Sequence, residues 1–144
     1  MISSLYMKFN TIVNKIIPKL LNNIVLNKNI SKQPFALGAC TMDSRYRPIS
    51  YGYNSYTKTH SIQKRFSEMA NLDYKEYLHA EIGAIIKSGR KVAYAIVVVR
   101  MTPGGKFANA KPCPVCQLAI KESGIQEVWY SNDSGNLELM LGED

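Results

Sequence analysis

The feature that most constrains this fold is the near-continuous apolar run from Val92 to Val99. Such a run is typical of a central β-strand covered on both faces, because a strand with one wet face would alternate apolar and polar residues. Segments with helix character lie on either side of it, at residues 76–87 and 113–123, and each is followed by a glycine, Gly89 or Gly124. Strands that alternate with helices lie parallel in one sheet, so the pattern predicts an α/β protein.

Further strands are predicted before and after this region. Two apolar segments separated by a short turn at Asp43-Ser44 indicate a β-hairpin. The remaining predicted elements are strands at 35–42, 48–53 and 126–131, a polar and basic connection at 54–65, a loop at 101–112 and a short final element at 137–141. Together they predict a three-layer α/β/α sandwich with a mixed central sheet of about five strands.

Residues 1–33 form an N-terminal segment in this prediction, ahead of a domain at 34–144. Apolar residues recur there every three or four positions, which predicts an amphipathic helix. Pro18 interrupts the pattern and should kink the helix or start a second one. We expect the apolar stripe to pack on the domain core. The alternatives are a contact that makes a homo-oligomer, or a nucleic-acid surface, since Lys8 and Lys15 flank the stripe.

Composition narrows the class of protein. A chain of 144 residues has room for one domain, and its three cysteines are too few for a disulfide scaffold, which favours a reducing, cytoplasmic compartment. It has no apolar run long enough to span a bilayer, and we expect no signal peptide and no membrane partner. The net charge is +7, and residues 1–65 hold ten basic side chains against one acid. This imbalance suggests an anionic partner or a solvated basic surface.

Two short motifs carry the chemistry. Residues 79–81 (His-Ala-Glu) open the helix before the central strand, and residues 112–116 (Pro-Cys-Pro-Val-Cys) open the helix after it. A helix–strand–helix crossover can bring both helix starts to the same region of the sheet. His79, Cys113 and Cys116 would then be three ligands of a zinc ion whose fourth position is left for water, as in catalytic zinc sites.

Glu81 is the predicted catalytic residue. A carboxylate beside the activated water prefers to hold a proton, so its pKa should rise and it can shuttle that proton to the substrate. The C-x-x-C pair alone could be a redox pair or half of a structural zinc site, but a redox pair leaves His79 and Glu81 unexplained. The combination of H-x-E with P-C-x-x-C is the signature of zinc-dependent nucleobase deaminases.

With these motifs, the sequence resembles the zinc-dependent cytidine/deoxycytidylate deaminase superfamily over residues 34–131. The segment 112–130, with Ser-Gly-Ile between the cysteine helix and an apolar strand, is most similar to the deoxycytidylate deaminase branch. The triplet 52–54 (Gly-Tyr-Asn) is also similar to that branch, and the chain looks like a small bacteriophage-type deaminase. The resemblance implies that Asn54 contacts the substrate sugar and that the backbone amide of Ala80 binds the carbonyl of the base.

The sequence also departs from the branch. Gly83 stands where the helix often has Asn, and residues 54–60 lack the usual Pro-Arg-Gly continuation. These differences leave the zinc chemistry intact and leave the substrate open. The first hypothesis is hydrolytic deamination of a free cytosine nucleotide, of the deoxycytidylate type, to the uracil product and ammonia. Lys58 and His60 would then bind the phosphate.

Two other functions compete with this one. A deaminase acting on C or A in single-stranded DNA or RNA would use the basic N-terminal half and aromatic side chains such as Tyr53. A zinc-stabilised binding protein without turnover is the third hypothesis, and the presence of Glu81 argues against it. Trp129 is predicted to lie in the core, with a place in the pocket wall as the alternative.

Overall fold

The computed structural model describes residues 2–26, 36–55, 58–72, 77–89 and 91–141. The elements are a π-helical turn η1 (Ile12–Ile16), the helices α1 (Ile2–Thr11), α2 (Ile17–Leu26), α3 (Ser61–Met69), α4 (Ala80–Ser88) and α5 (Pro114–Glu122), and the strands β1 (Ala36–Met42), β2 (Pro48–Tyr53), β3 (Ala95–Met101), β4 (Phe107–Ala108), β5 (Glu127–Ser131) and β6 (Leu137–Leu141).

The strands form one mixed sheet with the order β2-β1-β3-β5-β6, and the short β4 pairs with the end of β3. β3 is antiparallel to β1 and parallel to β5, whereas β6 returns antiparallel to β5 as a hairpin. The predicted parallel arrangement is therefore confirmed for the two strands that flank α5. All five β3 residues from Ala95 to Val99 are buried, as expected for a strand covered on both faces.

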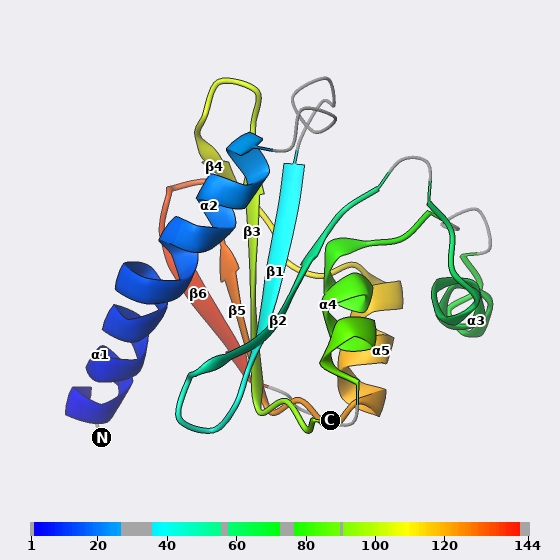
Figure 1. Cartoon of the computed structure of the whole chain (residues 1–144), viewed down its shortest axis with the longest axis horizontal. Helices are drawn as coiled ribbons and strands as arrows, with labels where there is room; N and C mark the ends of the chain where they lie inside the picture. Colours follow the sequence, from blue (N-terminus) through cyan, green and yellow to red (C-terminus); the bar gives the residue numbers. More distant parts are fainter. Residues whose placement is uncertain (1, 27–35, 56–57, 73–76, 90, 142–144) are drawn as a thin grey trace.

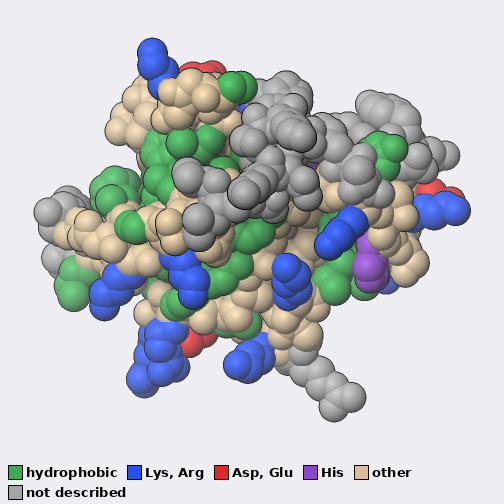
Figure 2. All heavy atoms as spheres, turned by 45° about the horizontal axis from the view of Figure 1, so that its top comes forward, with side chains coloured by type: hydrophobic (Ala, Val, Ile, Leu, Met, Phe, Trp, Pro, Cys, Tyr) green, Lys and Arg blue, Asp and Glu red, His purple; other side chains and the backbone are tan. Residues whose placement is uncertain are grey.

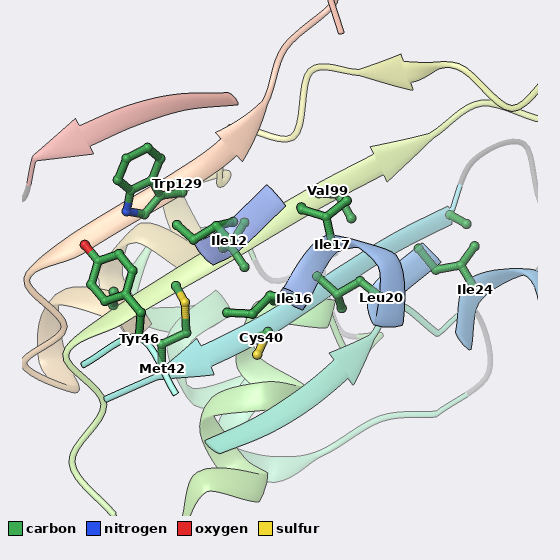
Figure 3. Close-up of a cluster of buried hydrophobic side chains, with 13 residues drawn as sticks. Ile12, Ile16, Ile17, Leu20, Ile24, Cys40, Met42, Tyr46, Val99 and Trp129 are labelled. Carbon is green, nitrogen blue, oxygen red and sulfur yellow. The ribbon is translucent and has the colours of Figure 1, made fainter. Parts of the chain in front are cut away.

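The N-terminal helices cover one face of the sheet, and α4 and α5 cover the other (Figure 1). The first face carries a core in which Ile12, Ile16 and Leu20 of the helices meet Cys40 of β1 and Val99 of β3 (Figure 3). All five of these side chains are fully buried. The amphipathic stripe thus packs on the sheet, and the three-layer sandwich is confirmed.

Pro18 lies in the first turn of α2, directly after the π-helical turn η1. The amide of Ile17 donates to the carbonyl of Ile12, five residues back, instead of four as in an α-helix. The wider turn precedes a proline, which has no amide to donate. The interruption predicted at Pro18 is therefore the start of a second helix, and α1 and α2 continue along the same face (Figure 1).

A buried polar network connects helix α1 to strand β5. The carboxylate of Glu127 in β5 accepts hydrogen bonds from Lys8 Nζ at 3.2 Å, Tyr94 OH at 3.2 Å, Trp129 Nε1 at 3.4 Å and the hydroxyl of Tyr46. Glu127 is only 7% exposed. We call this set the Glu127 network. A buried carboxylate needs such donors, so the network links α1, the β1–β2 turn and β5.

Several sequence-based boundaries were wrong. The connection at 54–65 contains the start of helix α3, which the run of basic residues concealed. Val92 was assigned to the central strand, but it is 81% exposed and the strand begins at Ala95. The loop at 101–112 holds the short strand β4, and the final element is strand β6. Phe35, placed at the start of β1, lies outside the described residues.

No helix in the described part of the chain is both long and apolar enough to cross a membrane. On the face shown in Figure 2, Lys and Arg side chains are widely spread, and Asp and Glu side chains are few among the atoms that are visible. This agrees with the excess of basic residues in the sequence.

Candidate metal centre

Two helix starts lie side by side on the same face of the sheet. His79 is the N-cap residue of α4 and Cys113 is the N-cap residue of α5, both with extended backbone, and Cys116 lies in the first turn of α5. Pro114 occupies a first-turn position, where its missing amide costs no helix hydrogen bond. The three predicted ligands therefore come from two helices that are separated in sequence by β3.

The structure brings the three side chains together. Nδ1 of His79 is 3.3 Å from Sγ of Cys116 and 3.6 Å from Sγ of Cys113, and all three ligand atoms lie within 4.8 Å of one another. Tetrahedral zinc, with Zn–S near 2.3 Å and Zn–N near 2.0 Å, requires nitrogen and sulfur to be about 3.5 Å apart. The donor types and spacings therefore fit a zinc ion held by one imidazole and two thiolates.

The two cysteine thiols lie close together, and each changes the pKa of the other. The hydrogen bond between them is the main cause that lowers the pKa of Cys113 to about 3 and raises the pKa of Cys116 well above its ordinary value. Burial also raises the pKa of Cys116. A bound divalent cation favours deprotonation of both thiols, and both sulfurs then bind as thiolates.

Glu81 lies in the first turn of α4 and is 4% exposed. Burial is the main cause that raises the pKa of its carboxyl above the ordinary value. The charges of His79 and Cys113 and the thiol of Cys116 also act on this pKa. A protonatable group is thus held directly beside the three ligands.

The start of α4 is held against β2 through a close approach at Gly52. A Cβ atom at this position would lie 2.3 Å from the carbonyl oxygen of Ala80 and 2.4 Å from the amide nitrogen of Ala84. Only glycine leaves room for this contact. Ala80 itself is buried as the first residue of α4, where the helix leaves its amide outside the intrahelical ladder.

Asn54 directly follows β2. Its Oδ1 accepts from the amide of Leu37 at 2.8 Å, and its own amide donates to the carbonyl of Leu37 at 3.2 Å. The side chain is therefore fixed to Leu37, near the start of β1. The side-chain NH2 group of Asn54 is the part that can reach a ligand.

Lys58 and His60, the two residues predicted to bind phosphate, lie near the start of helix α4, which His79 caps. The carbonyl of Lys58 accepts from the amide of Leu78, the residue before His79, at 2.9 Å, and the Lys58 side chain is exposed. His60 is the N-cap residue of α3, and its Nδ1 accepts from the amide of Ile62 at 3.1 Å. The His60 ring therefore has a structural role that the sequence did not suggest.

The aromatic residues considered for the pocket lie elsewhere. Tyr53 and Trp129 both belong to the core under the N-terminal helices, on the face opposite α4 and α5. The hydroxyl of Tyr53 accepts from Asn23 Nδ2 at 2.6 Å. The suggestions that Tyr53 stacks on a base and that Trp129 lines the pocket were therefore wrong, and the prediction of Trp129 as a core residue is confirmed.

One polar residue at the centre was missed. Gln63 of α3 is fully buried, and its Oε1 accepts from the backbone amide of His79 at 3.1 Å. The sequence signal was weak, because Gln63 stands in a basic stretch that reads as a loop. Only the apolar residues Ile62 and Phe66, four positions apart, indicated a helix there.

The fold and the ligand set together define the class. The family model for the cytidine and deoxycytidylate deaminase zinc-binding region matches residues 18–132, and the chain belongs to this family. The family is described by its zinc-binding region, and His79, Cys113 and Cys116 form a group that could hold such a zinc ion.

Particular relatives are more distant. A protein of Drosophila melanogaster named as a probable deoxycytidylate deaminase is 28% identical over 120 residues, which cover 76% of this chain and 55% of that protein. The chain thus spans about half the length of this curated relative. Cytidine deaminase from Mycobacterium tuberculosis is 18% identical, with a TM-score of 0.47 over 85% of this chain and 89% of that one.

Proposed function

We propose that this protein is a zinc-dependent hydrolase that deaminates a cytosine nucleotide of the deoxycytidylate type. The observation that carries the proposal is the cluster of one imidazole nitrogen and two thiol sulfurs within 4.8 Å, with the buried carboxyl of Glu81 in the helix turn that directly follows the imidazole. Family membership supports the deaminase chemistry, and the name of the Drosophila relative supports the choice of nucleotide.

The roles of the residues follow from their chemistry. His79, Cys113 and Cys116 hold the metal, which when bound supplies a water activated for attack at neutral pH. Glu81 accepts one proton from the attacking water and delivers it to the ring nitrogen. It then accepts the second proton, from the hydroxyl added to the ring carbon, and delivers it to the amino group as the C–N bond breaks. Water and cytosine are thereby converted to uracil and ammonia, with every proton accounted for.

The binding residues position the substrate. The amide of Ala80 donates to the carbonyl of the base, because the first amides of a helix have no partner within it. Asn54 contacts the sugar through its side-chain amide. Lys58 supplies positive charge for a phosphate, and His60, whose Nδ1 is used as a helix cap, can contribute only its Nε2–H donor.

A panel of substrates tests the proposal. Zinc-loaded protein would be incubated with deoxycytidylate, deoxycytidine, cytidine, guanine and single-stranded oligonucleotides containing C or A, and ammonia release would be measured. We expect the highest kcat/KM with deoxycytidylate. Turnover of an oligonucleotide without turnover of any mononucleotide would contradict the proposal and favour the polynucleotide deaminase, for which the basic surface in Figure 2 is the supporting observation.

The same panel addresses the third hypothesis. A protein that binds zinc tightly and turns over none of these substrates would be a binding protein, in which Glu81 has no catalytic use. Self-association and a cytoplasmic location remain predictions from the sequence.

A further inference from the structure

The start of α4 lacks the usual support for its N-cap amide. In a capping box, a Glu or Gln three residues into the helix reaches back to the amide of the N-cap residue. In α4 the N-cap residue is His79 and the corresponding position is Ile82, which has no acceptor and is fully buried. The support therefore has to come from outside the helix.

Gln63 supplies it from a different helix. Its Oε1 accepts from the His79 amide at 3.1 Å, and its Nε2 donates to Oγ of Ser67, one turn further along α3, at 3.4 Å. Gln63 is fully buried and Ser67 is 1% exposed, so these hydrogen bonds are made without competition from bulk water. A buried amide of this kind is costly to leave without partners.

The helix that carries Gln63 is itself well anchored. The ring of His60 caps its first turn, and Phe66 packs in a core with Ile82 of α4 and with Val115 and Cys116 of α5. The acceptor is therefore presented to His79 from an element that also contacts both ligand-bearing helices.

The side chain of His79 makes no capping hydrogen bond to its own helix, and its Nδ1 faces the two sulfurs instead. If the backbone of His79 could rotate, the position of its imidazole relative to the two sulfurs would be less well fixed. Fixing the backbone amide leaves the imidazole available to the metal. It also fixes the direction of the first turn, which carries Glu81.

We propose that Gln63 is a positioning residue of the metal centre, which holds His79 and the first turn of α4 in register with the two cysteines. This inference rests on the proposed function, because it assumes that His79 binds the metal. Residues that orient metal ligands through a second layer of hydrogen bonds typically contribute about 10- to 100-fold to metal affinity or activity.

The test compares three variants with the wild type. Gln63→Met removes the acceptor and keeps the length of the side chain. Gln63→Glu keeps an acceptor oxygen, and Ser67→Ala removes the hydroxyl that accepts from Nε2 of Gln63. Zinc affinity would be measured by competition with a chromogenic chelator, and coordination geometry by the visible absorption of the Co²⁺-loaded protein. Neither readout requires turnover.

We expect Gln63→Met to weaken zinc binding by about 10-fold or more and to change the Co²⁺ spectrum. Gln63→Glu should retain the wild-type spectrum, and Ser67→Ala should retain zinc affinity within about twofold. Unchanged affinity and spectrum in Gln63→Met, or equal losses in Gln63→Met and Ser67→Ala, would overturn the inference. A wild type that binds no zinc would instead overturn the proposed function.

A measurement on the wild type covers the case in which Gln63→Met does not fold. Hydrogen exchange of the His79 amide, followed by NMR in the zinc-loaded protein, should be strongly slowed. Exchange at the rate of an exposed amide would show that Gln63 does not hold it, and would overturn the inference without any substitution.

Discussion

In the proposed reaction, turnover depends on the proton that Glu81 carries. Glu81→Gln preserves the size of the buried side chain but cannot accept a proton, so kcat should fall by about 100- to 10,000-fold. The zinc content should stay at the wild-type value, because Glu81 is not one of the three ligands. Steady-state kinetics together with zinc analysis by atomic absorption would check this, and undiminished turnover would refute the role of Glu81.

The metal ligands differ from Glu81 in what their loss removes. Cys113→Ala should abolish both stoichiometric zinc binding and activity, because a site with two protein ligands binds the metal weakly. Cys40→Ala is the matched control, since Cys40 is a fully buried thiol in the core on the other face of the sheet. It should keep its zinc. Retention of full zinc content by Cys113→Ala would contradict the assignment.

The third thiol provides a test of burial. Burial raises the pKa of Cys40 from 9.0 to about 12. At pH 8, a thiol reagent should therefore label Cys40 only after unfolding.

Because folding disfavours the thiolate, the contribution of Cys40 to stability is fully present below pH 9.0 and is lost as the pH rises toward about 12. Denaturant titrations of wild type and Cys40→Ala over this range, which should converge at high pH, would measure it.

Packing of strand β2 against helix α4 sets the position of the candidate metal centre. In Gly52→Ala, the new methyl group would collide with the backbone of α4 at Ala80 and Ala84, where no flexible side chain can move aside. We expect a loss of about 1–3 kcal/mol in the free energy of unfolding. We also expect a drop in kcat, because the start of α4 carries His79 and Glu81.

Gly104 offers the control for this substitution. Its nearest neighbour to an added Cβ is the side chain of Thr102 at 3.9 Å, an ordinary contact. Gly104→Ala should therefore leave stability and activity unchanged. Equal effects at Gly52 and Gly104 would argue against the close approach as the cause.

Some of the helices and strands could be predicted from the sequence, and others could not. β3, α4 and α5 could be predicted because their apolar patterns and glycine stops are strong local signals. The grouping of His79, Cys113 and Cys116 could be predicted because the spacing of their motifs is specific. Helix α3 could not, because only Ile62 and Phe66 mark its apolar side within a basic stretch. The contact of Gln63 with His79 joins residues sixteen positions apart through tertiary packing, which no local pattern contains.

The Glu127 network connects parts of the molecule that are distant in sequence: helix α1, the β1–β2 turn and strand β5. Glu127→Leu would leave Lys8, Tyr46 and Trp129 without their acceptor, so we expect a loss of about 3–5 kcal/mol in the free energy of unfolding. Glu138→Leu is the control, since Glu138 is an exposed carboxylate on the adjacent strand with Tyr130 and Asn132 as partners. It should cost less than about 1 kcal/mol. Similar losses in urea denaturation would contradict a structural role for the network.

The order of strands in the sheet has a consequence for biosynthesis. β3 lies between β1, which is made before it, and β5, which is made after it. A nascent chain that has left the ribosome through β3 already contains α1, α2, β1, β2 and the imidazole of His79, but neither Cys113 nor Cys116. Metal loading therefore falls to the closing stage of folding, when α5 docks, and a ribosome-bound chain cut short before residue 113 should retain no zinc.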